Sequence, residues 1–274
     1  MRNSSDKTII AIDRGASFTD FGVVSRVGLE KTISLEKRDW KSIAEIYDDL
    51  NAIYRTNQAV FSGCAAGMPD KIRAHTNIIS EIDAIGFGGA ALAGCSECIV
   101  VSMGTGSAIV HFADSRARHV GGTGVGGGTI KGLASLICGV DDPLEIEALA
   151  LKGNASKTSL TIADLGYEEI SFLGADMTAS NFARVQTDSR EDLAAGILRL
   201  VGETVGIIAS ICARESNCRD HIVMVGKVAG NQFIRQVLEL VGKLYGTQFH
   251  FPKDPGLATV YGAALKYQYD RKTA

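Results

Sequence analysis

Apolar runs along the chain end repeatedly at small or acidic residues, as strands do before tight turns. The first run ends at Asp13, and the turn that follows, Arg14 to Ser17, leads into a second run. Apolar positions that recur on one side of the next polar stretch predict a helix. The predicted elements are strands at residues 8–12, 21–24, 32–35 and 59–62 and a helix over 42–54. They predict a mixed sheet covered by helices.

The same plan returns later in the chain. A helix predicted over residues 80–92 precedes strands at 99–102, 108–112 and 117–120, and a glycine turn at 104–107 separates the first two. Two copies of strand, small-residue hydroxyl turn and strand indicate an internal duplication. We therefore expect an α/β protein with two duplicated lobes, the first over residues 1–98 and the second over residues 99–274.

The second half of the chain is more helical. Asp142-Pro143 has the form of a helix start, and Ser189 with Asp192 caps a long helix with one apolar stripe. The remaining predicted elements are strands at 221–225 and 248–251 and helices over 231–244 and 256–267. The apolar stripe of the long helix fits either a core position or a dimer seam.

Composition and charge exclude several classes of function. The 274 residues are 46% hydrophobic, and 28 Lys and Arg against 31 Asp and Glu give a net charge of -3. Because no cationic stripe is present, we expect no nucleic-acid partner. The N-terminal residues lack the plan of a signal peptide, and Arg199 and Glu203 interrupt the most apolar stretch, so we expect no membrane span and a cytoplasmic location.

The six cysteines lie in apolar or small-residue surroundings, and we expect them to be reduced. Cys95 and Cys98 form a single CxxC pair. No second pair or HxxxH follows at zinc-site spacing, so the alternatives for this pair are structural thiols or a redox site.

Candidate chemistry lies in the turns. Gly15 and Ser17 can offer donors to an anion, and Asp13 beside them can hold a hydrated magnesium ion; a solvated hairpin is the alternative. The second turn, residues 104–107, offers a similar nest, and two such nests facing each other can clamp one polyphosphate. Residues 121–128 hold six glycines in eight positions and lead into a helix predicted from about Thr129. A loop whose backbone meets a ligand explains so many glycines better than a linker does.

These motifs together resemble the actin-like (ribonuclease H-like) ATPase fold of sugar kinases and Hsp70, and within that fold the type II pantothenate kinases. The resemblance covers nearly the whole chain. It rests on Asp13-x-Gly15-x-Ser17, the strand ending at Gly226, Gly262-Ala263-Ala264, the motifs at residues 81–84, 103–107, 120–129 and 176–182, and the long helix at 193–215.

The resemblance implies transfer of the ATP γ-phosphoryl group to the primary hydroxyl of pantothenate, the first committed step toward coenzyme A. It implies ATP and Mg²⁺ as cofactors, a homodimer, and acyl-coenzyme A as a further ligand. Asp13 would hold Mg²⁺, and Glu81 would take or orient the hydroxyl proton. The expected nucleotide contacts are Gly15, Ser17, Gly104, Thr105, Gly106, Gly126, Gly127, Gly128 and Gly226. A capping or solvated role at a helix start is the alternative for Glu81.

The chain departs from the family pattern at two places. Asp20 stands where the family has a lysine after the first turn, and His119 stands where it has an arginine, with Arg118 one residue earlier. Both changes remove positive charge where a phosphate or a carboxylated substrate is expected. Arg118 and His119 are the two candidates for binding the substrate in place of this arginine, and His119 fits without a register shift.

The sequence is also compatible with two other functions. The chain could be an actin-like ATPase or kinase for another small hydroxylated substrate, because residues 15–20 also resemble the N-terminal turn of hydantoinases and oxoprolinases. It could also be a non-catalytic protein that binds a nucleotide or coenzyme A.

Overall fold

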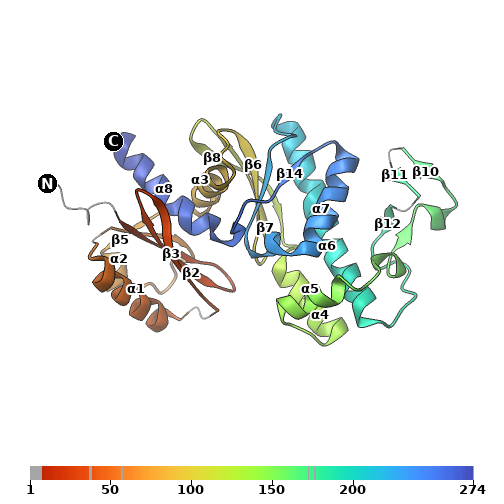
Figure 1. The fold of residues 1–274 in the computed structure, drawn as a ribbon, viewed down its shortest axis with the longest axis horizontal. Coiled ribbons are helices and arrows are strands. Elements are labelled where there is room, and N and C mark those ends of the chain that lie inside the picture. Colours follow the sequence, from red (N-terminus) through yellow and green to blue (C-terminus); the bar gives the residue numbers. More distant parts are fainter. Residues whose placement is uncertain (1–7, 37–38, 57, 172, 176, 274) are drawn as a thin grey trace.

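The computed structural model describes residues 8–36, 39–56, 58–171, 173–175 and 177–273. It has two lobes, each built around a five-stranded mixed sheet (Figure 1). The first sheet has the order β3-β2-β1-β4-β5, with β1 at Ile9–Arg14, β2 at Thr19–Ser25, β3 at Gly28–Leu35, β4 at Ala59–Gly63 and β5 at Thr76–Ile78. The second has the order β14-β13-β6-β7-β8, with β6 at Cys98–Met103, β7 at Ser107–Ala113, β8 at Arg116–Thr123, β13 at Ile222–Val225 and β14 at Phe249–His250.

The two sheets repeat each other strand for strand. The central strand of each, β1 or β6, pairs antiparallel with the next strand in sequence and parallel with a strand that returns after a helix. The returning strands end at glycines of the same conformation, Gly63 and Gly226, both at φ +86°. At either position a Cβ would lie 2.5 Å from a carbonyl oxygen of the central strand, that of Arg14 or of Met103. Only glycine fits both the space and the dihedral angle, and the predicted duplication is confirmed.

Helices cover both faces of each sheet, and the two lobes exchange one helix. The first sheet packs against α1 (Trp40–Tyr54) on one face and against α8 (Ala258–Thr273) on the other. The second sheet packs against α3 (Glu81–Ala93) on one face and against α6 (Arg190–Glu215) on the other. Helix α3 follows the first sheet in sequence but covers the second, and α8 does the reverse. The lobe boundary after residue 98 stays a prediction.

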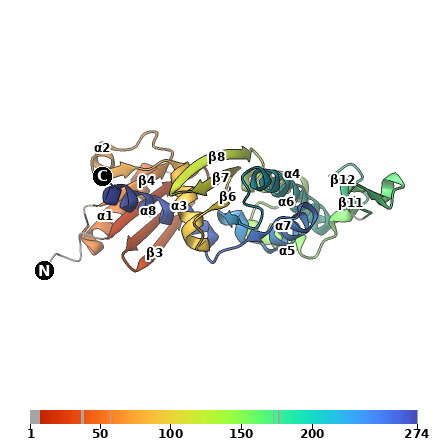
Figure 2. The same ribbon diagram turned by 90° about the horizontal axis from the view of Figure 1, so that it is seen from above.

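Helices α3 and α8 touch each other between the two sheets (Figure 2). Glycines allow this close approach: a side chain at Gly88 would overlap the carbonyl of Ala258, and one at Gly262 would overlap the carbonyl of Ala84. The two helix backbones therefore cross in direct contact.

Most helices begin where the capping signals predict. The side chains of Ser80, Asp142, Ser189 and Asn231 accept hydrogen bonds from the first-turn N–H groups of α3, α5 (Pro143–Ala150), α6 and α7 (Gln232–Tyr245). The glycine-rich segment differs from the prediction. Strand β8 continues through Gly121 and Gly122 to Thr123, and α4 (Gly127–Cys138) begins two residues before Thr129. Only the middle of that segment is a loop.

Several short elements have no counterpart in the sequence prediction. Helix α2 (Asp70–Arg73) lies in the first lobe. In the second, β9 (Leu160–Thr161) pairs with β12 (Thr178–Ser180), and β10 (Glu169–Ile170) pairs with β11 (Leu173–Gly174), in the part of the chain that projects farthest from the first lobe (Figure 1).

The motif at residues 176–182 anchors this projecting part to α6. Thr178 Oγ1 and Asn181 Nδ2 donate to the two carboxylate oxygens of Glu203, at 2.9 and 3.0 Å. Asp176 lies outside the described residues. The motif therefore joins the projection to the long helix, away from the turns that carry the other motifs.

Helix α6 is long and apolar enough to cross a membrane by length and composition, yet 56% of its apolar stretch is buried inside the protein. Its buried face includes Ile197, Val201 and Val205, which pack with Ile99 and Val101 of β6 in one core. These contacts are those of a core helix.

Candidate functional site

The two predicted hydroxyl turns face each other and touch. The turn after β1 belongs to the first lobe and the turn after β6 to the second. Ser17 Oγ and Thr105 Oγ1 form a hydrogen bond of 2.9 Å between them. The duplication thus places two small-residue turns at one point between the lobes, and a nucleotide held there must separate these two hydroxyls.

Three carboxylates gather behind this contact. Asp13 is opposite Asp20 in the β1–β2 register, and Glu81 is the first residue of α3. The pKa of Asp13 is raised to about 7, first because the carboxyl group is removed from water and then because Glu81 and Asp20 repel its charge, while Lys227 opposes the rise. The structure therefore brings together Asp13 and Glu81, which lie far apart in the sequence.

Lys227 is the residue of this site that the sequence reasoning missed. It follows Gly226 in the second lobe and reaches the first, where its Nζ lies 3.0 Å from Asp20 Oδ1 and 2.6 Å from Ser34 Oγ. The same ammonium group lies 3.4 Å from the centre of the Phe18 ring. A cation from the opposite lobe thus meets Asp20, the residue that replaces the lysine of the family pattern. The only local signal was its place beside Gly226.

Arg14, the next residue after Asp13, contacts the loop after β4. Its Nη1 donates to the carbonyls of Cys64 and Ala66, and its guanidinium lies over the Trp40 ring, 4.5 Å from the centre. These contacts fasten the first hairpin to the loop after β4.

The glycines at the start of α4 pack against the second hairpin. Gly127 N donates to the carbonyl of Gly104 at 2.7 Å, and Gly128 N donates to that of Thr105 at 2.9 Å. A Cβ at Gly127 would lie 2.9 Å from Gly104 O and from Val228 Cγ2, and one at Gly126 would lie 2.7 Å from Gly106 O. The protein itself therefore lies against these glycines and uses two of their N–H groups. Their contact with a nucleotide stays a prediction.

Replacing Gly127 with valine should destabilise the fold as well as the nucleotide site. The added side chain must push α4 away from the hairpin, because a Cβ there meets a backbone carbonyl that cannot rotate aside. Overpacking of this kind costs about 1–3 kcal/mol. Chemical denaturation should show the loss without any ligand, and Gly132→Val, at an α4 position with nothing within 4 Å, is the control. Wild-type stability in Gly127→Val would contradict the packing role.

The space beside the backbone differs among Gly15, Gly104 and Gly226. A Cβ at Gly15 would meet only Phe18 O at 3.4 Å, and one at Gly104 only Gly106 O at 3.9 Å, so these two turn positions have free space beside them. Gly226 is held against Met103, at the base of the second turn, and its N–H donates to Pro255 O at 2.9 Å.

Arg118 and His119 lie on the exposed edge strand β8, on opposite faces. Ala117 faces α3, since a Cβ added at Gly86 would lie 2.6 Å from that of Ala117. Alternation along the strand places His119 on the same side as Ala117. Arg118 is paired with His111 on the other face. His119 therefore shares its side of the sheet with α3, the helix that begins at Glu81.

Replacing Asp13 with asparagine should stabilise the protein near pH 8. The pKa of Asp13 rises on folding from 3.8 to about 7, so the folded state binds this proton more tightly than the unfolded state does. The resulting stabilisation is complete below the unfolded pKa and is lost as the pH rises through about 7. Asparagine stays neutral at every pH. A tenfold difference in proton affinity between the folded and unfolded states corresponds to about 1.4 kcal/mol, so the gain should be a few kcal/mol at about pH 8 and should vanish toward pH 4. Urea denaturation across this range measures it.

The exposed Asp188 gives the matched control, because Asp188→Asn removes the same formal charge from a solvated position. Equal stability of Asp13→Asn and wild type at about pH 8 would show that burial and the neighbouring carboxylates do not raise the pKa of Asp13 in the folded protein.

Known proteins share both the sequence pattern and the fold. The type II pantothenate kinase of Bacillus anthracis is 31% identical over 180 residues, 64% of each chain, so this chain spans just under two thirds of that relative. The type II pantothenate kinase of Staphylococcus haemolyticus is 25% identical over 93% of this chain and 98% of its own length.

Among solved structures, the activator of 2-hydroxyisocaproyl-CoA dehydratase from Clostridium difficile, with bound ADPNP, superposes with a TM-score of 0.66. It covers 97% of this chain and 98% of its own at 15% identity. The expected actin-like fold is confirmed. The Fumble family model matches residues 95–250, more than half of the sequence, and the chain belongs to the Fumble family.

Proposed function

We propose that the chain is a pantothenate kinase that transfers the γ-phosphoryl group of ATP to the primary hydroxyl of pantothenate. The observation that carries the proposal is the meeting of Asp13, Glu81 and Lys227 behind the contact between Ser17 and Thr105. Phosphoryl transfer needs a metal ligand, a proton acceptor and a cation at one place between two phosphate-binding turns. The names of the relatives supply the acceptor, pantothenate.

The residues present suit Mg²⁺ and ATP. Asp13, Asp20 and Glu81 against Lys227 leave an excess of negative charge. Burial raises the pKa of Asp13, and repulsion by Glu81 and Asp20 adds to this rise. Asp13 would hold Mg²⁺, directly or through water, because hard oxygen ligands are those that this ion prefers. When bound, the ion would neutralise charge on the phosphates. Ser17, Thr105 and the turn glycines would contact the nucleotide, with Gly226 on the adenosine side.

Glu81 would accept the proton of the substrate hydroxyl. It is exposed at the first position of α3 and close enough to Asp13 to raise the pKa of that residue. In the transfer, the acceptor oxygen loses its proton to Glu81 and forms the new bond to phosphorus, while the bond to the ADP oxygen breaks. Lys227 would turn from Asp20 to the transferred phosphoryl group and stabilise its charge.

His119 would bind the carboxylate of the substrate. At saturating Mg²⁺ and ATP, His119→Arg should raise kcat/KM for pantothenate near pH 8, because a guanidinium always carries its charge and forms a charge-assisted hydrogen bond with a carboxylate. A charge-assisted hydrogen bond of about 1.5–3 kcal/mol corresponds to a gain of roughly 10- to 150-fold.

Arg118→Ala is the matched control, since its side chain leaves the other face of β8. If kcat/KM for pantothenate is unchanged in His119→Arg and collapses in Arg118→Ala, the role belongs to Arg118.

The direct test is ADP release by the purified chain with and without pantothenate. Release that depends on pantothenate supports the proposal. Release that depends only on another hydroxylated acid, or on none, would favour the alternative of a related kinase or ATPase, which the replacement of the family lysine by Asp20 motivates. Nucleotide binding without turnover would favour a non-catalytic binding protein.

The homodimer, the acyl-coenzyme A ligand and the cytoplasmic location also belong to this proposal. The projecting part of the second lobe exposes apolar side chains, namely Leu165, Tyr167, Ile170 and Val185, which suit a contact with a second copy.

A further inference from the structure

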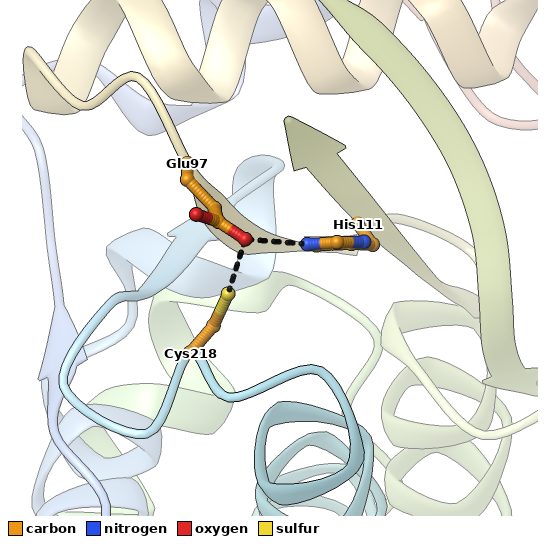
Figure 3. A group of neighbouring side chains, drawn as sticks. All are labelled: Glu97, His111 and Cys218. Atoms are coloured by element: carbon orange, nitrogen blue, oxygen red, sulfur yellow. Dashed lines mark hydrogen bonds and ion pairs between the residues drawn. The ribbon is translucent and has the colours of Figure 1, made fainter. Parts of the chain in front are cut away.

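A second group of reactive side chains lies in the second lobe, outside the proposed kinase site. Figure 3 shows the Glu97 carboxylate between the imidazole of His111 and the thiol of Cys218. Glu97 Oε1 lies 3.4 Å from His111 Nε2 and 4.0 Å from Cys218 Sγ, and one ligand atom from each residue lies within 4.8 Å of the others.

The sheet brings these residues together from three distant segments. Glu97 directly precedes β6, His111 lies on β7 opposite Ile99, and Cys218 lies in the loop between α6 and β13. All three therefore meet at the beginning of β6. The glycine turn of the proposed nucleotide site lies at the opposite end of this strand, so the two sites are separate.

One buried nitrogen of the group, His111 Nε2, has no hydrogen-bond partner among the described residues. His111 Nε2 is shielded from solvent and makes no hydrogen bond, since its approach to Glu97 does not meet the geometry of one. A buried polar nitrogen without a partner costs free energy. A ring nitrogen aimed at a carboxylate and a thiol would be satisfied by a metal ion shared among them.

We propose that Glu97, His111 and Cys218 form a zinc site. Imidazole nitrogen, thiolate sulfur and carboxylate oxygen are the ligands that Zn²⁺ accepts together. A carboxylate and a thiolate carry two negative charges, which a divalent cation balances. Arg118 of the neighbouring strand β8 is opposite His111, and Arg116 lies on the same face of that strand as Arg118.

The fourth ligand would be water or the nearby Cys95. Glu97 is 59% exposed at the side chain and opens onto a surface depression lined in part by Cys95, His221 and His250. An ion can therefore enter from solvent. Because the ligands belong to the segments that begin β6 and β13 and to the middle of β7, the ion would hold these segments together. This role does not depend on the proposed kinase function.

Cobalt titration of the full-length, untagged protein tests the site, because Co²⁺ in a zinc site with a thiolate ligand gives a sulfur-to-metal charge-transfer band and visible bands of tetrahedral geometry. We expect one ion per chain, displaced by Zn²⁺, and zinc in the protein as purified. Loss of a residue that only orients a ligand weakens metal binding about 10- to 100-fold, so Cys218→Ser and Glu97→Gln, which remove ligands, should weaken it at least as much.

Glu97→Gln keeps the result interpretable, because its exposed side chain can change without disturbing the core. Cys64→Ser and His75→Ala, both exposed and in the first lobe, are the controls and should bind Co²⁺ as wild type does. Added zinc should raise the melting temperature of wild type and of these controls but not of Glu97→Gln. Wild type without the charge-transfer band, or a band that survives in both Cys218→Ser and Glu97→Gln, would overturn the proposal.

Discussion

Replacing Glu81 with glutamine should lower the rate constant for pantothenate phosphorylation by about 10²–10⁴-fold, the usual loss when a general base is removed. ATP affinity should change little, because Glu81 acts on the acceptor hydroxyl. Its nearness to Asp13 puts the proton acceptor beside the expected metal ligand. Steady-state kinetics together with ATP titration by calorimetry separates the two effects.

The start of α3 also provides a control. Ser80 Oγ accepts from Asp83 N at 3.0 Å and donates to Asp83 Oδ2 at 2.8 Å, so Ser80 and Asp83 form the cap that the sequence left open as a role for Glu81. Asp83→Asn should therefore affect stability more than rate. Wild-type turnover by Glu81→Gln would remove Glu81 as the base.

Replacing Lys227 with methionine should reduce the rate constant by about 10²–10³-fold, as expected for loss of a group that stabilises transition-state charge. Methionine keeps much of the length of the side chain and its contact with Phe18, but it cannot neutralise a phosphoryl group. The pKa of Asp13 should also rise further, since Lys227 is the cation that lowers it. Single-turnover kinetics would report the rate of the chemical step.

Two variants refine this test. Asp20→Asn releases Lys227 from its ion pair and should retain much more activity than Lys227→Met, because the cation remains. Lys253→Met, at an exposed position of the same lobe, should behave as wild type. If Lys227→Met is as active as wild type, the lysine only ties the two lobes together.

The sequence predicted the parts of the fold that are determined locally. The turn at Asp13 to Ser17 and the turn at residues 104–107 each combine small residues with flanking apolar runs, and these signals do not depend on the rest of the chain. The strands β9 to β12 contain only two or three residues each, too few for a period to be recognised. Each of these strands is defined by its pairing with another short strand of the same chain.

The parts of the site that depend on long-range contacts could not be predicted. Lys227 reaches Asp20 across 207 positions of the sequence. Glu97, His111 and Cys218 share no zinc-site spacing, because the sheet register brings them together. The glycines at 126–128 predicted a close contact of the backbone with a ligand, and composition alone could not show that the second hairpin packs against them.

The exchanged helices have a consequence for how the chain folds. The apolar face of the first sheet, with Ile9, Val24 and Val60, is covered by Val260 and Ala263 of α8, so this layer closes only when the two ends of the sequence meet. During synthesis on the ribosome, that face of the sheet stays uncovered until α8 has been made. Contacts between residues so far apart in sequence slow folding. The two similar halves thus depend on each other for cooperative stability, and either half expressed alone would expose an aggregation-prone surface.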